Sequence, residues 1–566
     1  MNHSRWNLLP PAPDNYLAKV SGFSPLVAQL LYDRGLTEPS QIESFLAADK
    51  RLSGDPFLLP DMHQAVTRIY QALLSGENIA IYGDFDVDGI TASALLIQGL
   101  SILGSKAVVH IPHRLTEGHG LRTAALENLH QQGISLVITV DCGITGFTQV
   151  KKARKMGMDI VITDHHIPPP EIPPATAVVD PKLSNSNYPF SELAGVGVAY
   201  KLLQALLQGM GKEKQLDEML DLVALGTVGD MMPLMGENRY MVKYGVELLN
   251  TTPRLGIREM VTQAGLNIGS LSPETISWVI APRLNAAGRL AHAITSYKLL
   301  MTTSPQEAQG LSAWLEQKNT ERQKLTTTAL AKAREQVLAQ GISHILVAGG
   351  KDFPAGIVGL IAGRLSEEFY RPAVVARIGE RISGGSCRSI PEFNIIQALE
   401  QCRDLLLQFG GHPKAAGFTL LTHNLPRLQH RLSQLAATQL DGVDLRPRID
   451  IDTEITLPEL SGNTFKSIQM LAPFGYENPL PVFLSRSVEV VDCHTMGNSR
   501  EHLRMKVKQS GAVWDAVAFR LGNFLAETHS LIDMVYNLEI DHWSGEEKLR
   551  LNILDFAPAD SNIPGS

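Results

Sequence analysis

The stretch NIAIYGDFDVDGITASALLIQGL, residues 78–100, joins a short β-branched run to an acidic turn and then to a long apolar segment of helical character. The same order of strand, polar cluster and helix repeats to residue 180, with further strands expected in AVVHIPH, LVITVDC, DIVITDHH and TAVVDP. Alternating strands and helices form parallel sheets that are covered by helices on both faces. We therefore predict an α/β fold built on a parallel sheet.

Acidic and histidine side chains follow the predicted strands almost every time. Ligands of such sheets collect beyond the carboxyl ends of the strands, so side chains at these positions are expected to meet. The residues concerned are Asp84, Asp86, Asp88, Asp141, Asp164, His165, His166 and Asp230.

The motif DFDVDG, residues 84–89, places three carboxylates at alternate positions. Two like charges about 4 Å apart repel by roughly 1 kcal/mol in water and roughly 4 kcal/mol at a partly buried site. Open solvent, arginine partners or bound cations must offset this repulsion. An EF-hand begins in the same way, but its twelfth position must be a bidentate glutamate, and here that position is Leu95. A solvated acidic turn is the remaining structural alternative.

The combination of ligand types favours bound cations. Few basic residues adjoin these aspartates. Oxygen ligands with one or two imidazoles suit Mn²⁺ or Mg²⁺ better than a thiolate site would. Carboxylates shared between two cations about 3.5–4 Å apart activate water and stabilise a leaving oxygen. We therefore predict a two-metal site for Mn²⁺ or Mg²⁺.

The 566 residues predict several domains, because single cores rarely grow beyond about 250–300 residues. A stretch opened by Ser304-Pro305 has no Gly or Pro after Gly310 and predicts a long spacer helix. The last part has strand-like runs separated by turns, which indicates a small β-barrel of the class that includes oligonucleotide-binding (OB) folds. The predicted boundaries are 1–75 for an N-terminal helical segment, 76–303 for the catalytic domain, 304–340 for the spacer helix, 341–435 for a smaller α/β domain and 443–560 for the barrel.

Composition is that of a globular protein, with 44% hydrophobic and 19% charged residues. No apolar run approaches the roughly 20 residues that span a bilayer, and the N-terminus lacks the pattern of a signal peptide. The four cysteines form no CxxC pair, so we expect reduced thiols and a cytoplasmic protein. The net charge of −8 argues against indiscriminate nucleic-acid binding but permits a local basic channel.

Arginines in polar or small-residue segments are candidates for holding phosphate, because the guanidinium fork matches phosphate oxygens. Arg114 lies in IPHRLTEGHGL, and Arg283 and Arg289 lie in APRLNAAGR. Surface solubility for the first, and structural salt bridges for the other two, are the alternatives.

Two glycine-rich segments of the second α/β domain are expected to form loops. SGGSCRS carries Ser386 and Arg388, and FGGHPKAAGF carries His412 and Lys414. Such loops can present backbone N–H groups to an anion, although a tight turn is the simpler explanation for either one.

Aromatic residues of the predicted barrel are candidates for stacking on bases, at roughly 1–3 kcal/mol for each contact. They are Trp514, Phe519 and Trp543. Packing in the barrel core is the alternative for each of them.

Seven motifs in order resemble those of one family. DFDVDG, VDCG, TDHH and GTVGDMMPL resemble the successive motifs of the DHH phosphoesterase superfamily. PHRLTEGHGL, APRLNAAGR and FGGHPKAAGF narrow the resemblance to the RecJ family of single-strand-specific 5′→3′ DNA exonucleases. The resemblance extends from about residue 20 to 560, and it implies a DHHA1-like second α/β domain and an OB-like barrel.

The resemblance also implies roles for individual residues. Asp141 would bridge the two metals, with His165 and His166 as the other catalytic residues and His166 directed at the scissile phosphate. Asp164 would support or ligate a metal, and which metal Asp84 or Asp86 binds stays open. The implied metal ligands are Asp84, Asp86, Asp88, Asp141, His165 and Asp230.

For the substrate, the resemblance assigns Arg114, Ser386 and Arg388 to the 5′-terminal phosphate and Arg283 to the backbone near the cut. Arg289 and His412 are further candidates. His119 stands where the family commonly has tyrosine, which puts a stacking role at this position in question.

The implied function is metal-dependent degradation of single-stranded DNA from the 5′ end to mononucleotides, in DNA repair and recombination. The alternatives are a phosphoesterase for nanoRNA or cyclic dinucleotides and a non-catalytic DNA-binding relative. The resemblance implies a single-strand-binding protein and a RecQ-type helicase as partners, and we expect a monomer that does not associate with membranes.

Overall fold

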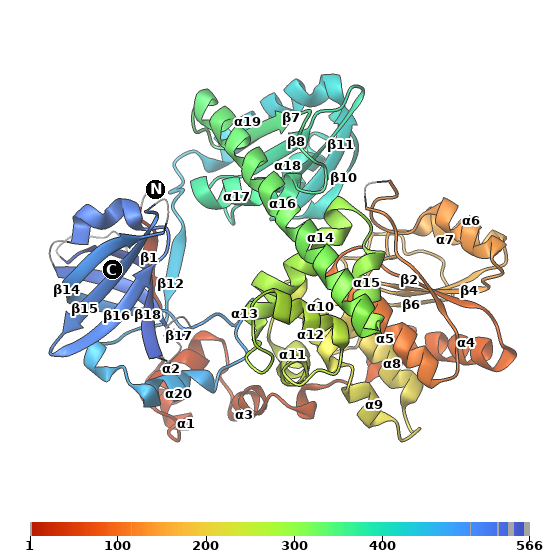
Figure 1. Cartoon of the computed structure of the whole chain (residues 1–566), viewed down its shortest axis with the longest axis horizontal. Helices are drawn as coiled ribbons and strands as arrows, with labels where there is room; N and C mark the ends of the chain where they lie inside the picture. The colour runs from red at the N-terminus through yellow and green to blue at the C-terminus, as the bar shows by residue number, and fades with distance from the viewer. Residues whose placement is uncertain (1–2, 115, 498–499, 529–530, 542–547, 560–566) are drawn as a thin grey trace.

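The computed structural model describes residues 3–114, 116–497, 500–528, 531–541 and 548–559. Three bodies are visible in Figure 1: a catalytic α/β domain, an upper α/β lobe joined to it by one long helix, and a β-barrel to one side. Three predicted parts, namely the parallel-sheet domain, the second α/β domain and the barrel, are therefore confirmed.

The catalytic domain contains a five-stranded sheet in the order β3-β2-β4-β5-β6, and every pair of neighbours is parallel. All five predicted runs form strands. Their bounds are β2 (Ile79–Tyr82), β3 (Val108–His110), β4 (Leu136–Val140), β5 (Asp159–Thr163) and β6 (Ala177–Val179).

Helices cover both faces of this sheet, as β2 illustrates. Ile79 and Ile81 pack in the hydrophobic cluster under one set of helices, and Ala80 and Tyr82 pack in the cluster on the opposite face. Such double burial explains why the strands read as continuous apolar runs. One cluster includes residues of α4 (Met62–Ser75), α5 (Val87–Ile102) and α8 (Gly195–Leu207), and the other includes residues of α6 (Thr123–Gln131) and α7 (Phe147–Lys155).

A helical region completes the catalytic domain. A π-helical turn at Ile276–Ile280 precedes Pro282, which lacks the N–H that an ordinary α-turn would use. The helices are α9 (Glu213–Asp217), α10 (Leu220–Gly229), α11 (Gly236–Leu249), α12 (Leu255–Gln263), α13 (Pro273–Thr275), α14 (Ala281–Leu290) and α15 (Ile294–Met301).

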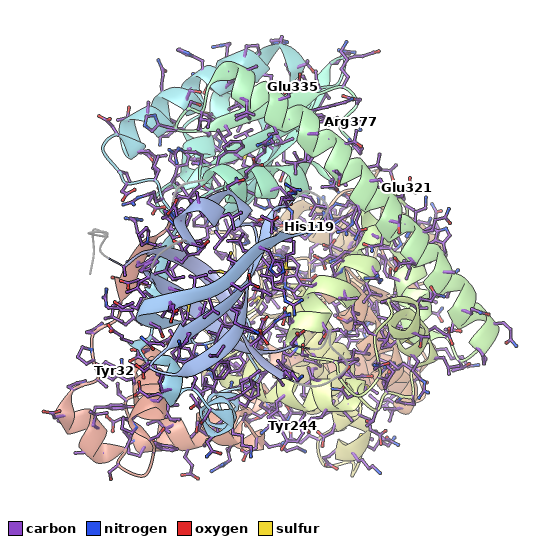
Figure 2. The ribbon with its side chains drawn as sticks, turned by 60° about the vertical axis from the view of Figure 1, so that its left-hand side comes forward. Tyr32, His119, Tyr244, Glu321, Glu335 and Arg377 are labelled. Carbon is purple, nitrogen blue, oxygen red and sulfur yellow. The ribbon has the colours of Figure 1, made fainter. Side chains whose placement is uncertain are left out.

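The predicted spacer helix is α16 (Pro305–Gln340), and Ser304 caps its first turn. Leu315 packs in the core of the catalytic domain, whereas Ala333 and Val337 pack in the upper lobe. Glu321 and Glu335 mark its course along the outside of the molecule in Figure 2. Because one helix contributes to two cores, it holds the lobes at a set separation.

The upper lobe has a five-stranded mixed sheet in the order β10-β11-β9-β8-β7, in which only β7 and β8 run parallel. Its elements are β7 (Leu346–Gly350), α17 (Val358–Phe369), β8 (Ala373–Arg377), β9 (Ile382–Arg388), α18 (Ile395–Glu400), β10 (Leu406–His412), β11 (Ala415–Leu421) and α19 (Leu425–Leu440).

The barrel is a five-stranded sheet closed by the pairing of β14 with β17. Closure removes the free sheet edges. The strands are β14 (Phe483–Met496), β15 (His502–Gln509), β16 (Ala512–Ala518), β17 (Leu531–Asp541) and β18 (Lys548–Pro558), with the short β13 (Thr453–Glu454) beside β14 and α20 (Gly462–Gln469) before it.

The N-terminal segment packs mostly against the barrel. It opens with β1 (Arg5–Leu8), which pairs in parallel with β12 (Arg448–Ile451). Residues of α1 (Asp14–Lys19), α2 (Pro25–Asp33) and α3 (Pro39–Ala47) share the hydrophobic cluster of the barrel. The next helix of the chain, α4, instead covers the catalytic sheet.

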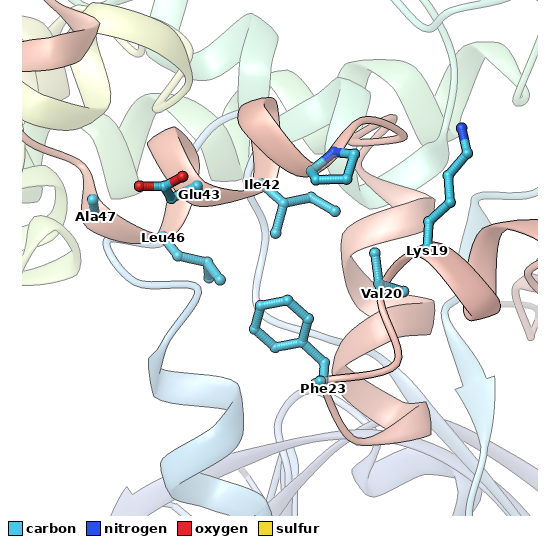
Figure 3. Close-up of a pocket in the computed structure, with 9 residues that line it drawn as sticks. Lys19, Val20, Phe23, Ile42, Glu43, Leu46 and Ala47 are labelled. Carbon is cyan, nitrogen blue, oxygen red and sulfur yellow. The ribbon is translucent and has the colours of Figure 1, made fainter.

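A pocket of about 490 Å³ lies between these N-terminal helices. Phe23, Ile42 and Leu46 line it in Figure 3, with Lys19 and Glu43 at its borders. None of its lining residues belongs to the acidic and histidine motifs. Among the residues described, no helix is both long and apolar enough to cross a membrane.

Candidate active site

Three of the predicted carboxylates lie at the ends of neighbouring strands. Asp84 stands two residues after β2, Asp141 follows β4 directly and Asp164 follows β5 directly. All three are buried. Asp141 has a φ of 58°, a left-handed conformation that is uncommon outside glycine and that clusters at functional sites.

Two helix N-termini orient the other carboxylates of DFDVDG. Asp86 caps α5 and accepts hydrogen bonds from the backbone N–H groups of Asp88 and Gly89, at 3.1 and 3.2 Å. Asp88 lies in the first turn of α5 and accepts from the N–H groups of Gly195 and Val196 at the start of α8, at 2.7 and 2.8 Å. Carboxylates are stabilised at helix N-termini, so the backbone holds both side chains in place.

His165 connects these carboxylates with the helical region. Its Nε2 lies 3.1 Å from Oδ1 of Asp141, 3.7 Å from Oδ2 of Asp230 and 3.8 Å from Oδ2 of Asp88. Asp230 is the C-cap of α10, so it reaches the cluster from outside the sheet.

Asp164 holds the DHH turn together. Its Oδ1 accepts from the backbone N–H groups of His165 and His166, and from Nδ1 of His166 at 2.8 Å. Its Oδ2 accepts from the N–H of Ile144 at 2.9 Å. With both oxygens engaged by the protein, Asp164 is placed to support the histidines.

Three groups within this cluster have the spacing of a metal site, since their ligand atoms lie within 4.8 Å of one another. Asp141 belongs to two of the groups and His165 to two, which fits a site with shared ligands. The groups are Asp84–Asp86–Asp141, Asp88–His165–Asp230 and Asp141–His165–His166.

Unbalanced charge supports the fit of a divalent cation. Oδ1 of Asp84 is buried and has no hydrogen-bond partner among the residues described, although buried polar atoms are normally satisfied. Burial, and then repulsion from Asp88, Asp86 and Asp84, raises the pKa of Asp141 well above its usual range. Burial and the neighbouring carboxylates likewise raise the pKa of Asp230. Mn²⁺ or Mg²⁺ would satisfy the orphan oxygen and offset the repulsion.

The two histidines of the DHH turn differ in charge. Burial and repulsion from His166 lower the pKa of His165 to about 3, so it is a neutral imidazole of the kind that ligates metals. Burial alone would lower the pKa of His166, but its hydrogen bond to Asp164 raises that pKa to about 9.

His119 lies at the candidate metal site itself. Its Nδ1 is 3.0 Å from Oδ2 of Asp84, and its ring centroid is 5.5 Å from that of His166. Figure 2 labels it near the centre of the molecule, where the domains meet. A stacking role in place of tyrosine stays a prediction, while the structure gives His119 a direct contact with a predicted metal ligand.

Three of the predicted arginines converge from three elements. Arg114 lies in the loop after β3, 4.7 Å above the ring of Phe85, which separates Asp84 from Asp86. Burial, and then repulsion from Arg114, Arg322 and Arg388, lowers the pKa of Arg289 on α14 to about 9. Guanidinium groups gathered in this way are suited to a multiply charged phosphate.

The other predicted substrate residues are in two situations. Arg283 donates to Oε2 of Glu316 on α16 at 2.5 Å, so its guanidinium already has a carboxylate partner. Burial, and then repulsion from His166 and Lys182, lowers the pKa of His412 in the upper lobe.

The expectation of a glycine-rich loop is wrong for SGGSCRS, whereas FGGHPKAAGF contains a tight turn at Pro413 and Lys414. Residues 383–388 of SGGSCRS lie in β9, whose residues pair with β8 on one side and β11 on the other. FGGHPKAAGF forms the hairpin of β10 and β11. The ladder therefore uses the backbone groups of β9 and β11, which are both internal strands. Close packing explains Gly385, where a Cβ would lie 2.4 Å from the ring of Phe418. Side chains remain available, and Nη1 of Arg388 donates to Oγ of Ser386 at 3.2 Å.

The barrel aromatics also differ from one another. Trp514 is half-buried against the barrel core and donates to the carbonyl of Leu457 at 3.3 Å. Phe519 is 46% exposed, and Trp543 lies outside the described residues.

Comparisons with known proteins agree with this arrangement. The DHH family, N-terminal domain, matches residues 78–227, the DHHA1 domain matches 336–438 and the RecJ OB domain matches 451–555. The single-stranded-DNA-specific exonuclease RecJ of Bacillus subtilis (strain 168) is 38% identical, over 98% of this chain and 71% of its own length. RecJ of Haemophilus influenzae is 31% identical, over 94% of this chain and 96% of its own. The chain belongs to the RecJ family.

A solved structure extends the RecJ likeness to three dimensions. The crystal structure of RecJ from Thermus thermophilus in complex with Mn²⁺ has a TM-score of 0.83 at 28% identity, and covers 98% of this chain and 80% of that one. The same protein in complex with Mg²⁺ gives a TM-score of 0.79 at 27% identity, with coverage of 98% and 79%.

Sequence reasoning missed several residues of this RecJ-family site. Arg322 lies on α16, which was expected to be only a spacer, and its buried Nε has no hydrogen-bond partner among the described residues. Lys182 follows β6 and acts electrostatically on His165, Asp230 and His412. The position of Lys182, two residues after the strand-end Asp180 in TAVVDPK, was a usable signal, whereas nothing in the pattern of α16 pointed to Arg322.

The sequence patterns did not point to Gly195 either, and its contact with Asp141 leads to a testable prediction. A Cβ there would lie 2.6 Å from Cβ and 2.8 Å from Oδ1 of Asp141. We expect Gly195→Ala to displace this carboxylate and to weaken Mn²⁺ binding by roughly 10–100-fold, the effect of disturbing the support of a metal ligand. Isothermal titration with Mn²⁺ measures the change.

Gly197, two residues further along α8, is the matched control. A Cβ there meets only side-chain atoms at 3.5 Å or more, so Gly197→Ala should bind Mn²⁺ like the wild type. Equal affinities for all three proteins would show that Gly195 does not shape the site.

Proposed function

We propose that this protein is a metal-dependent exonuclease that degrades single-stranded DNA in the 5′→3′ direction to 5′-mononucleotides, in DNA repair and recombination. One observation carries the proposal: acidic and histidine side chains from separate stretches of the chain converge with metal-site spacing at one edge of the catalytic sheet. Membership of the RecJ family supports the same substrate and reaction.

The residues that would hold Mn²⁺ or Mg²⁺ are Asp84, Asp86, Asp88, Asp141, His165 and Asp230. Two bound cations would supply an activated water and would stabilise charge that develops on the phosphoryl oxygens. The backbone hydrogen bonds to Asp86 and Asp88 orient two of the ligands before any cation binds. Such preorganisation is what a site for charge stabilisation requires.

His166 is the proposed contact to the scissile phosphate. Its Nδ1 is engaged by Asp164, and this leaves Nε2 as the nitrogen that can donate to a phosphoryl oxygen. Asp164 thereby acts as the residue that orients the imidazole, and Asp141, His165 and His166 are the proposed catalytic residues.

Polarity is proposed to come from the arginines, and strand selectivity from the space between the two lobes. Arg114, Arg289 and Arg388 would hold the 5′ phosphate with Ser386, beside the metal cluster. Arg283 and His412 would contact the strand nearer to the cut. A passage between the two lobes that is too narrow for a duplex would restrict the enzyme to single strands.

Two rival functions are less well supported. A phosphoesterase for nanoRNA or cyclic dinucleotides would share the metal site but has no use for a barrel, and here residues 451–555 match the RecJ OB domain. A non-catalytic DNA-binding relative would not need a complete ligand set, whereas every acidic and histidine position of the motifs is filled.

The cellular setting is part of the same proposal. A single-strand-binding protein and a RecQ-type helicase are the proposed partners, and a monomer is the proposed working form. The four cysteines are free thiols, which suits a reducing compartment such as the cytoplasm.

The test is a time course on a single-stranded oligonucleotide with a 5′-phosphate label, in Mn²⁺, in Mg²⁺ and in EDTA. We expect a labelled mononucleotide as the first product with either metal and no product in EDTA. The same strand in a blunt duplex should resist cleavage. Labelled fragments that shorten gradually from the 3′ end would contradict the proposed polarity.

A further inference from the structure

Arg239 is the largest fully buried side chain among the described residues, and the site does not use it. Its guanidinium donates to four backbone carbonyls: to Phe45 from Nε at 2.7 Å, and to Leu471, Ala472 and Pro473 from the two Nη atoms at 2.6–3.4 Å. Its Cζ lies 3.7 Å above the ring of Phe45. A buried charge is tolerated only when it is hydrogen-bonded, so the position of this side chain is fixed by those carbonyls.

The carbonyls belong to segments that are far from Arg239 along the sequence and lie outside the catalytic domain. Arg239 lies on α11, Phe45 lies on α3, and residues 471–473 lie between α20 and the first long barrel strand. Figure 1 shows α3 between α11 and the barrel. One side chain therefore joins the catalytic domain, the N-terminal segment and the barrel.

The turn before Arg239 makes a second contact with the barrel side. The N–H of Leu234 donates to the carbonyl of Tyr476 at 2.9 Å, and Met235 packs against the hydrophobic cluster of the barrel. A Cβ on Gly475 would lie 2.6 Å from Cδ1 of Leu234, so the two segments of the chain touch at this point.

Residues 230–239, which include this turn and Arg239, also reach the candidate metal site. Asp230, at their start, is a predicted ligand. Nδ2 of Asn238 donates to the carbonyl of Glu192 at 2.6 Å, three residues before Gly195, whose N–H holds Asp88. Residues 230–239 thus connect the metal ligands with the segment that leads into the barrel.

We propose that Arg239 is a positioning residue for long substrates: it fixes the barrel relative to the metal centre, so that one strand can occupy both. The inference rests on the proposed function. Two linked binding surfaces act together only when their geometry allows simultaneous engagement, and the gain is then roughly 10²–10⁴-fold. A dinucleotide would reach only the metal site and does not need the barrel.

The test compares a 5′-phosphorylated dinucleotide with a 40-nucleotide strand in Arg239→Lys and Gly475→Val. Arg239→Lys keeps the positive charge but loses the planar guanidinium that donates to several carbonyls. In Gly475→Val the added side chain would push Leu234 away from the segment that leads into the barrel. We expect kcat/KM for the dinucleotide to stay near the wild-type value, and kcat/KM for the long strand to fall at least tenfold, part of the linkage gain.

Lys243→Met is the matched control, because Lys243 lies one turn further along α11 and donates to Ala47 of the N-terminal segment at 2.8 Å. Its ratio of long-strand to dinucleotide activity should be unchanged. Equilibrium binding of both oligonucleotides in EDTA provides a readout without catalysis, and the long strand alone should bind more weakly to the two test variants.

Equal losses on both substrates, or an unchanged ratio in the variants that fold, would overturn the inference and leave Arg239 with a role in stability only. If the lysine variant does not fold, Gly475→Val decides. If the wild type cleaves neither substrate, the proposed function fails, and the binding comparison in EDTA still decides whether Arg239 sets the geometry of strand binding.

Discussion

Asp141→Asn should reduce nuclease activity by well over a hundredfold. Changing a residue that only supports a metal ligand already costs up to about 100-fold, and Asp141 is itself a proposed ligand. Asp141 is shared by two of the three candidate metal groups, so its replacement disturbs more ligand sets than the loss of Asp84 or Asp86 would. Initial rates on a 5′-labelled single strand in Mn²⁺ provide the measurement.

The same substitution should stabilise the metal-free protein. Burial, and then repulsion from Asp88, Asp86, Asp84 and Asp230, raises the pKa of Asp141, and an uncharged amide avoids both the cost of burying the charge and the repulsion. Relief of about 1 kcal/mol would raise the Tm of the catalytic domain in EDTA by about 2–4 °C, whereas added Mn²⁺ should raise the Tm of the wild type more than that of the variant.

Opposite effects on activity and stability would distinguish a metal site from a structural acidic cluster. An Asp141→Asn protein with full activity would refute the proposed mechanism. A lower Tm in EDTA would show that the carboxylate contributes favourable contacts without metal, contrary to the electrostatic argument.

Arg388→Ala should remove the preference for a 5′ phosphate. A hydrogen bond to a charged group contributes about 1.5–3 kcal/mol, which corresponds to a loss of roughly 10–150-fold in kcat/KM. The loss should be confined to the 5′-phosphorylated strand, because a 5′-hydroxyl strand offers no terminal phosphate to Arg388. Steady-state rates on the two strands measure the effect.

Arg377→Ala is the control for this prediction. Arg377 ends β8, next to β9 that carries Arg388, but its side chain is exposed, and Figure 2 labels it well away from His119. We expect no change on either strand. If the Arg388 variant lost activity equally on both strands, Arg388 would serve the cut itself and not the 5′ end.

Local sequence patterns predict much of the fold. The apolar runs that end in DFD, VDC and TDHH are short and bounded by polar residues, so each had to be a buried strand with its carboxylates at one edge. The spacer helix was predictable because Ser304-Pro305 supplies a start and its interior has no helix breaker after Gly310.

The glycine-rich segments show where local reasoning fails. SGGSCRS has the composition of a turn, yet strands on both sides enclose it as β9. A Cβ at Gly385 would lie 2.4 Å from the ring of Phe418, so tight packing, which depends on a distant strand, explains the glycine.

The sequence by itself determined which side chains could bind cations and on which edge of the sheet they would stand, because strand periodicity and ligand chemistry are local properties. Only the tertiary structure decided that Gly195 leaves space for Asp141, that Arg322 joins the other arginines and that Arg239 reaches the barrel. Those contacts join residues far apart along the chain, and their energies depend on burial and distance, which no local pattern encodes.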